Sequence, residues 1–108
     1  MPQTERALRL LGLAARARAL VIGTPLVCTA LSRSKTPLLV LCAKDASENT
    51  RKRLADRTAF YHTELITLPL TCAELAHTIG KKEALVAAVG VSDQNLATAI
   101  AAALKENT

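Results

Sequence analysis

Three consecutive cations, Arg51, Lys52 and Arg53, carry the most distinctive chemistry of this sequence. They follow an apolar run at residues 38–42, typical of a buried strand, and a short polar segment that can cap a helix. This order predicts a helix N-terminus and a block of positive charge at one end of a sheet, where α/β proteins commonly bind ligands. Such an arrangement favours binding of an anion, and of a large one in particular.

Two turns of the chain have the same predicted geometry. Residues 23–25 follow a short apolar segment and open a helix, and residues 44–47 do so after the strand at 38–42. In an α/β topology successive strand ends bring such turns together, so that unpaired N–H groups, Arg51 and Lys52 face one ligand. Phosphate oxygens suit that surface.

The sequence lacks the patterns of common catalytic sites. It contains no Gly-rich dinucleotide fingerprint, no phosphate loop and no Gly-x-Ser-x-Gly motif. Asp45 and Glu48 form the nearest carboxylate pair, and we assign them to the dipole of a helix N-terminus, which favours acidic residues. We therefore expect no enzymatic activity and no cofactor.

The cysteines and histidines do not predict a metal site. Cys28, Cys42 and Cys72 are widely spaced and have apolar neighbours, so we expect buried free thiols. His62 and His77 lack a partner at ligand spacing and are predicted to be surface residues.

Composition indicates one domain, spanning 1–108, with a positive field in its first half. With 50% apolar residues, the chain is not disordered. No apolar run approaches the ~20 residues of a membrane span, and the first residues do not resemble a secretory signal, so we expect a cytoplasmic location. The net charge of +5 divides into +7 up to Arg57 and −2 beyond it. This asymmetry favours a polyanionic partner, the alternative being an ordinary basic, solvated surface.

Hydrophobic periodicity predicts strands that alternate with helices. Each strand is nearly all apolar, which indicates one sheet covered on both faces. The predicted elements are helices at 4–15, 25–32, 48–61, 72–80 and 94–104 and strands at 19–22, 38–42, 65–68 and 84–89. The expected N-caps are Thr4, Thr24, Thr71 in a capping box with Glu74, Ser92, and either Ser47 or Asp45.

Phe60 and Tyr61 are the only aromatic residues, and both fall at the predicted end of a helix. Domains that read single strands stack bases on aromatic side chains, so this class of nucleic-acid reader is disfavoured. We expect the two rings to pack beneath the following strand.

Four segments carry a family resemblance: LLGLAARAR, VIGTPLV, LVLCAKDASENTRKRL and ELAHTIGKKEALVAAVGV. They resemble the L-seven-Ae/L-thirty-e ribosomal protein family, specifically its bacterial YlxQ-like branch, over nearly the whole chain from about Arg6 to Leu104. The resemblance implies a three-layer α/β/α sandwich around a mixed four-stranded sheet. It also implies binding of kink-turns, which are sharply bent RNA elements with tandem sheared G·A pairs and a bulged nucleotide.

The family reads RNA with the start of its second helix, through the pattern Gly-x-Asn-Glu-x-x-Lys, helped by the turn after the next strand and the loop before the last strand. The Gly is present here as Gly23, whereas Pro25, Leu26 and Thr29 occupy the Asn, Glu and Lys positions. Because Pro25 and Leu26 side chains cannot hydrogen-bond base edges, we expect reduced base specificity. The RNA-contacting residues that the resemblance and the basic turns imply are Gly23, Thr24, Pro25, Leu26, Thr29, Lys44, Asp45, Ser47, Arg51, Lys52, Lys81 and Lys82.

Two functions follow as hypotheses. The first is an RNA-binding, ribosome-associated protein that contacts structured, kink-turn-like RNA through helix N-termini and basic residues. The alternative is a protein-interaction module of the same fold, in which the apolar corner of Pro25 and Leu26 has replaced RNA readout. Its partner would belong to the ribosome or the translation machinery. We expect neither a membrane nor a metal ion as a partner.

Overall fold

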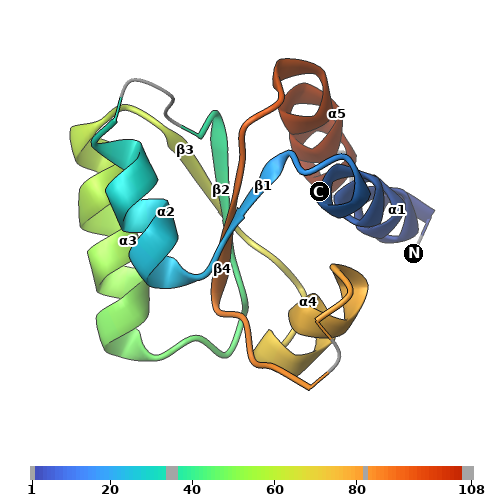
Figure 1. Cartoon of the computed structure of the whole chain (residues 1–108), viewed down its shortest axis with the longest axis horizontal. Helices are drawn as coiled ribbons and strands as arrows, with labels where there is room; N and C mark the ends of the chain where they lie inside the picture. Colours follow the sequence, from blue (N-terminus) through green and yellow to red (C-terminus); the bar gives the residue numbers. More distant parts are fainter. Residues whose placement is uncertain (1, 34–36, 82, 106–108) are drawn as a thin grey trace.

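Helices cover a central sheet on both faces, in three layers. The computed structural model describes residues 2–33, 37–81 and 83–105. Figure 1 shows α2 and α3 on one face of the sheet and α1, α4 and α5 on the other. The elements are α1 (Pro2–Arg16), β1 (Leu20–Ile22), α2 (Thr24–Leu31), β2 (Leu39–Cys42), α3 (Glu48–Phe60), β3 (Glu64–Thr67), α4 (Cys72–Thr78), β4 (Ala88–Val91) and α5 (Gln94–Lys105).

The sheet is mixed and has the strand order β1-β4-β2-β3. Strands β2 and β3 are parallel, whereas β4 lies between β1 and β2 and is antiparallel to both. Strands β1, β2 and β3 therefore run in the same direction, and β1 and β3 form the two edges. The predicted α/β class, as a three-layer α/β/α sandwich with a mixed four-stranded sheet, is confirmed.

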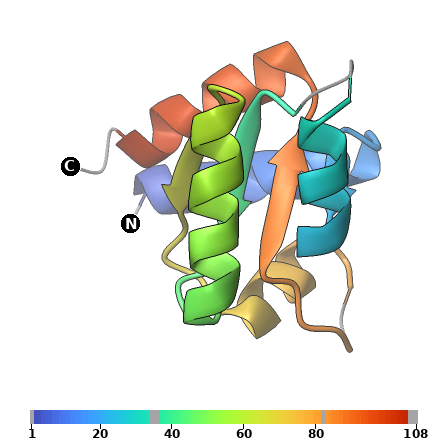
Figure 2. The ribbon, with the colours of Figure 1, turned by 90° about the vertical axis from the view of Figure 1, so that its left-hand side faces the viewer.

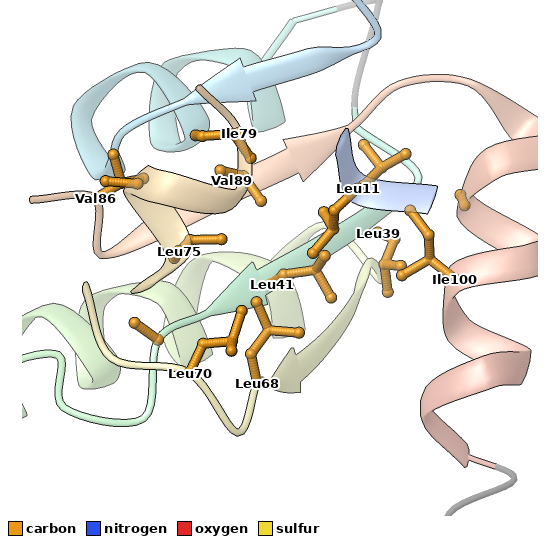
Figure 3. Packing of buried hydrophobic residues seen from close by; sticks show 14 residues of the cluster. Leu11, Leu39, Leu41, Leu68, Leu70, Leu75, Ile79, Val86, Val89 and Ile100 are labelled. Atoms are coloured by element: carbon orange, nitrogen blue, oxygen red, sulfur yellow. The ribbon is translucent and has the colours of Figure 1, made fainter. Parts of the chain in front are cut away.

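Alternation along the central strand β2 divides the core into two clusters. Leu41 packs on the side of α1 and α5, with Leu11 and Ile100 (Figure 3). Val40 points to the opposite face and packs with Leu54 of α3. All five side chains are fully buried, and each side chain of this size contributes about 1.5–3 kcal/mol to folding. Helices are thereby held against both faces of the sheet.

Most predicted elements agree with the observed ones within two residues, but the last strand does not. We expected it at 84–89, and β4 begins at Ala88 because pairing with β1 and β2 sets its register. The Ala84 N–H instead donates to the Lys81 carbonyl, at 3.1 Å, in a turn. At the other end of the chain, α1 begins at Pro2, so Thr4 lies within the helix and is not its cap.

Two further N-caps differ from the prediction. Gly23, not Thr24, is the N-cap of α2. At α5 the carboxylate of Asp93 accepts a backbone N–H of the first turn at 2.9 Å, whereas the Ser92 hydroxyl donates to the Ala19 carbonyl at 3.0 Å. Ser92 therefore ties α5 to the start of β1 and does not cap the helix.

The two aromatic rings behave differently. Tyr61 is half-buried and packs against the cluster beneath α2 and α3, as expected. Phe60 is 74% exposed and touches the Tyr61 ring edge-on, with 4.8 Å between ring centroids. The prediction that Phe60 packs beneath the next strand is wrong, because the last turn of α3 directs its side chain to solvent.

Candidate nucleic-acid interface

One end of the sheet gathers the turns that were predicted to bind an anion. Because β1, β2 and β3 run the same way, α2, α3 and α4 all begin at this end, and the loop before β4 enters there (Figure 1). The Gly23 N–H donates to the Ala88 carbonyl at 2.9 Å, and the Ala43 N–H donates to the Ala87 carbonyl at 2.8 Å. We call this end the rim, formed by residues 23–26, 43–52, 70–74, 80, 81 and 83–87.

The start of α2 presents backbone N–H groups beside apolar side chains. Gly23 has φ 97° and ψ 143°, which favours glycine, and no side chain caps the helix. Thr24 is half-buried, whereas Pro25 and Leu26 are exposed. Thr29 lies one turn further along, where its hydroxyl donates to the Pro25 carbonyl at 3.0 Å. Thr29 is therefore outside the rim, and the side chains of Pro25 and Leu26 offer no hydrogen bond to a base.

The start of α3 is polar. Ser47 Oγ accepts the Thr50 N–H at 3.2 Å, which confirms Ser47 as the N-cap. The N–H groups of Glu48 and Asn49 precede the first intrahelical hydrogen bond and have no acceptor within the helix. This end of α3 therefore offers exposed donors and the positive end of a helix dipole.

Two of the three predicted cations on α3 share one face of the helix. Arg51 and Lys52 are exposed and stand three and four residues from Glu48 and Ala55, so these four positions form one stripe. The stripe lines a shallow depression of about 690 Å³. Arg53 is exposed but does not line this depression. Glu48 adds one negative charge beside the two cations.

The start of α4 is an acidic corner of the rim. Asp45 Oδ1 accepts the Cys72 N–H at 2.7 Å, and the Cys72 side chain and backbone hydrogen bonds lower the pKa of Asp45. Glu74 and Thr71 form the predicted capping box, and the hydrogen bonds from Thr71 lower the pKa of Glu74. Lys44 is exposed beside these carboxylates. Asp45 thus anchors the start of α4. The carboxylates of Asp45 and Glu74 partly compensate the positive charge of Lys44.

The loop before β4 completes the rim. Lys81 is exposed and follows Gly80, whose φ is 85°. Lys82 lies outside the described residues. Leu85 is 77% exposed in this loop. The sequence did not predict this, because Leu85 stands in an apolar run that is typical of a buried strand. The topology places Gly23, Thr24, Pro25, Leu26, Lys44, Asp45, Ser47, Arg51 and Lys52 at the turns and first turns of α2 and α3. Lys81 follows the end of α4, where its N–H donates to the Ala76 carbonyl at 2.7 Å.

The thiols are buried or half-buried and free. Cys28 and Cys42 are buried, as predicted, whereas Cys72 is only half-buried. Burial raises the pKa of Cys42, an effect that the positive charge of Arg51 opposes. Burial, followed by the interaction with Asp45, raises the pKa of Cys72 to about 11. For both side chains these effects disfavour the thiolate, which is the reactive form.

His62 and His77 are exposed, as predicted. Among residues 2–33, 37–81 and 83–105, no group of three or more His, Cys, Asp or Glu side chains is placed to hold a metal ion. In the same ranges, no helix has the length and apolar character needed to cross a membrane.

Comparison with solved structures identifies the fold. A protein of unknown function from Bacillus halodurans C superposes with a TM-score of 0.85 at 32% identity, covering 93% of this chain and 97% of that one. The 15.5 kD RNA binding protein of Giardia lamblia superposes with a TM-score of 0.78, covering 98% and 88% of the two chains; at 15% identity this likeness concerns the fold alone. The chain is thus an α/β/α sandwich around a mixed sheet, with three helix starts at one end of that sheet.

Curated relatives narrow this class. No family model matches the chain. The RNA-binding protein YlxQ of Enterococcus faecium is 36% identical over 77 residues, which span 71% of this chain and 73% of the relative. The RNA-binding protein YlxQ of Bacillus subtilis strain 168 is 39% identical over 88 residues, spanning 82% and 84%. The chain belongs to the YlxQ family, the branch of the L-seven-Ae/L-thirty-e fold that its sequence resembles.

Proposed function

We propose that this chain binds structured RNA through the rim and does so on the ribosome. The observation that carries the proposal is the meeting, at one end of the sheet, of the starts of α2 and α3 with the exposed cations Lys44, Arg51 and Lys52. Two relatives at 36% and 39% identity are named RNA-binding proteins, which supports RNA as the polyanion.

Phosphate groups are the part of RNA that this surface suits best. Free N–H groups at helix starts and exposed cations attract phosphates without reading sequence. At the α2 start, Pro25 and Leu26 have no side-chain donor or acceptor, and the Thr29 hydroxyl is bonded to the Pro25 carbonyl. Binding therefore depends mainly on the backbone and on the shape of the RNA.

The kink-turn is the RNA shape that we propose as the preferred ligand. Its bend brings phosphates of two helical arms close together, and the rim spans the ends of β1, β2 and β3 across the width of the sheet, where several phosphates can be met at once. We expect selectivity for the bent backbone with little dependence on the identity of single bases. We also propose a cytoplasmic location, where ribosomes are found.

A paired charge reversal tests the proposal. The double variant Arg51→Glu/Lys52→Glu is compared with wild type for affinity to a kink-turn fragment of ribosomal RNA, over a salt series. We expect the affinity to fall at least about tenfold at low salt, and the salt slope to fall by about 2, one for each lost phosphate contact.

The matched control is Arg53→Glu/Arg57→Glu, which changes the net charge equally on the same helix but off the stripe of Arg51 and Lys52. It is expected to keep most of the affinity and the slope. Equal losses in both double variants would show attraction by overall charge alone, and an unchanged affinity in the first would remove the rim from the RNA surface.

A further inference from the structure

Strand β1 is an edge of the sheet, and no strand within residues 2–33, 37–81 and 83–105 pairs with its outer side. The Gly23 N–H donates to the Ala88 carbonyl of β4, and the Ala19 carbonyl accepts the N–H of Ser92, the residue after β4. In an antiparallel pair every second residue faces the partner strand, so the N–H and C=O groups of Val21 also point toward β4. The N–H and C=O groups of Leu20 and Ile22 consequently point away from β4, toward the open edge. An unpaired edge of this kind is a template for another strand.

An apolar groove runs along this edge. It has a volume of about 520 Å³, and Leu20, Val21 and Ile22 form one wall. The other wall is formed by Leu26, Thr29 and Ala30 of α2 and by Arg33, which follows the C-cap of that helix. Leu26 is 61% exposed there. A strand added to β1 would place alternate side chains into this groove, against α2.

The charges around the groove discriminate between occupants. Arg33 lines the groove, and Arg16 and Arg18 are exposed in the segment just before β1. No acidic residue is among the lining residues that the structure describes. A second copy of this chain, with its net charge of +5, would bring like charges together. An acidic segment would bring complementary ones.

We propose that the groove binds an extended, acidic segment of a partner protein, which pairs with Leu20 and Ile22 as a fifth strand. Apolar side chains at alternate positions of the segment fill the groove, and its Glu or Asp side chains face Arg33 and the cations before β1. This site is separate from the cations of α3, so it does not depend on the proposed RNA binding. The two surfaces share only Leu26.

The test uses capped hexapeptides that alternate Val with Glu, Lys or Gln, titrated into the full chain while amide resonances and amide hydrogen exchange are followed. We expect the Val–Glu peptide to bind and to slow exchange of the Leu20 and Ile22 amides about tenfold. A Val–Glu peptide that is N-methylated at every position has no amide N–H left on either edge, cannot pair as a strand and should not bind.

Ala30→Glu and Arg33→Glu should each weaken the Val–Glu peptide about tenfold, through like charge in the groove. Leu13→Glu is the control, because Leu13 is 47% exposed on α1 and does not line the groove. The proposal is overturned if no peptide protects Leu20 and Ile22, if the Val–Lys or N-methylated peptide binds equally well, or if a ribosomal RNA fragment occupies the groove instead. If a variant does not fold, the hydrogen-exchange measurement on the wild-type chain with these peptides still tests the proposal.

Discussion

Helices α2 and α3 begin at the same end of the sheet and lie side by side on one face, yet their first turns have opposite character (Figure 2). The side chain of Ser47 caps α3, which presents Arg51 and Lys52 to solvent. The backbone of Gly23 caps α2, which presents Pro25 and Leu26. One scaffold thus places a polar, cationic helix start beside an apolar one.

The difference between the two helix starts shows that a surface can attract phosphate groups without having side chains that read bases. A helix N-terminus offers N–H groups whatever its side chains are, so the apolar residues at α2 remove hydrogen bonds to base edges without removing affinity for phosphate. The same residues create an exposed apolar corner next to the groove along β1. In the two proposals above, the same residues thus account for weak readout of bases and for one end of the apolar groove.

Restoring the polar pattern at α2 is the change with the largest expected effect. The triple variant Pro25→Asn/Leu26→Glu/Thr29→Lys should prefer a kink-turn about tenfold or more over the same RNA with its G·A pairs replaced, because each bidentate base contact contributes about 1–3 kcal/mol. The control replaces the same three residues by Ala. If both triple variants show equal preference, the pattern at α2 does not determine base readout in this chain.

The cap of α2 depends on backbone conformation. Gly23→Ala should destabilise the fold by about 1–3 kcal/mol, because φ 97° with ψ 143° is a region that only glycine occupies readily. No atom lies within 4 Å of the added Cβ, so the cost is backbone strain and not a clash. Urea unfolding measures it. Gly12→Ala, inside α1, should be neutral or stabilising, and an equal loss in the two variants would contradict this account.

The cap of α3 depends on a side chain. Ser47→Ala should cost about 1 kcal/mol, because the Thr50 N–H loses its acceptor. Ser47→Asp should keep the stability, since a carboxylate caps equally well and suits the helix dipole. Equal destabilisation by Asp and by Ala, in the same urea assay, would mean that Ser47 contributes something other than a cap.

The start of α4 differs from the starts of both α2 and α3, because two carboxylates, Asp45 and Glu74, accept its backbone N–H groups. The pKa values of Asp45 and Glu74 are lowered in the fold, so their stabilising effect is present above the unfolded values of about 3.9 and 4.3 and is lost as the pH falls through the lower folded values. Thermal unfolding between pH 6 and pH 2.5 should therefore show a loss of stability below about pH 4. The variant Asp45→Asn/Glu74→Gln should show a smaller loss, and an identical profile would contradict the assignment.

Local signals predicted much of this molecule. Ser47 and the pair of Thr71 and Glu74 mark helix starts because each makes its hydrogen bonds within three residues of itself. The nearly continuous apolar strands correctly indicated a sheet covered on both faces, and the turns at 23–25 and 44–47 do meet at one end. These features depend on short stretches of chain, whose chemistry can be read directly.

Features set by distant pairing were not predictable in the same way. The start of β4 depends on its register with β1 and β2, and the apolar run at 84–89 contains no residue that marks it. In the sequence Asp45 stands just before α3, which made it a candidate cap of that helix. Its carboxylate instead accepts the N–H of Cys72, 27 residues away, at the start of α4. The groove along β1 exists because the strand order leaves β1 at an edge, which no local pattern records.

The central claim is that RNA binds at the rim, and amide chemical shifts test it most directly. The isotopically labelled chain is titrated with a kink-turn fragment of ribosomal RNA. We predict that the resonances of Gly23, Leu26, Lys44, Arg51 and Lys81 shift together and saturate with the RNA, while those of α1 and α5 stay unchanged. Shifts confined to α1 and α5, with none at the rim, would contradict the account.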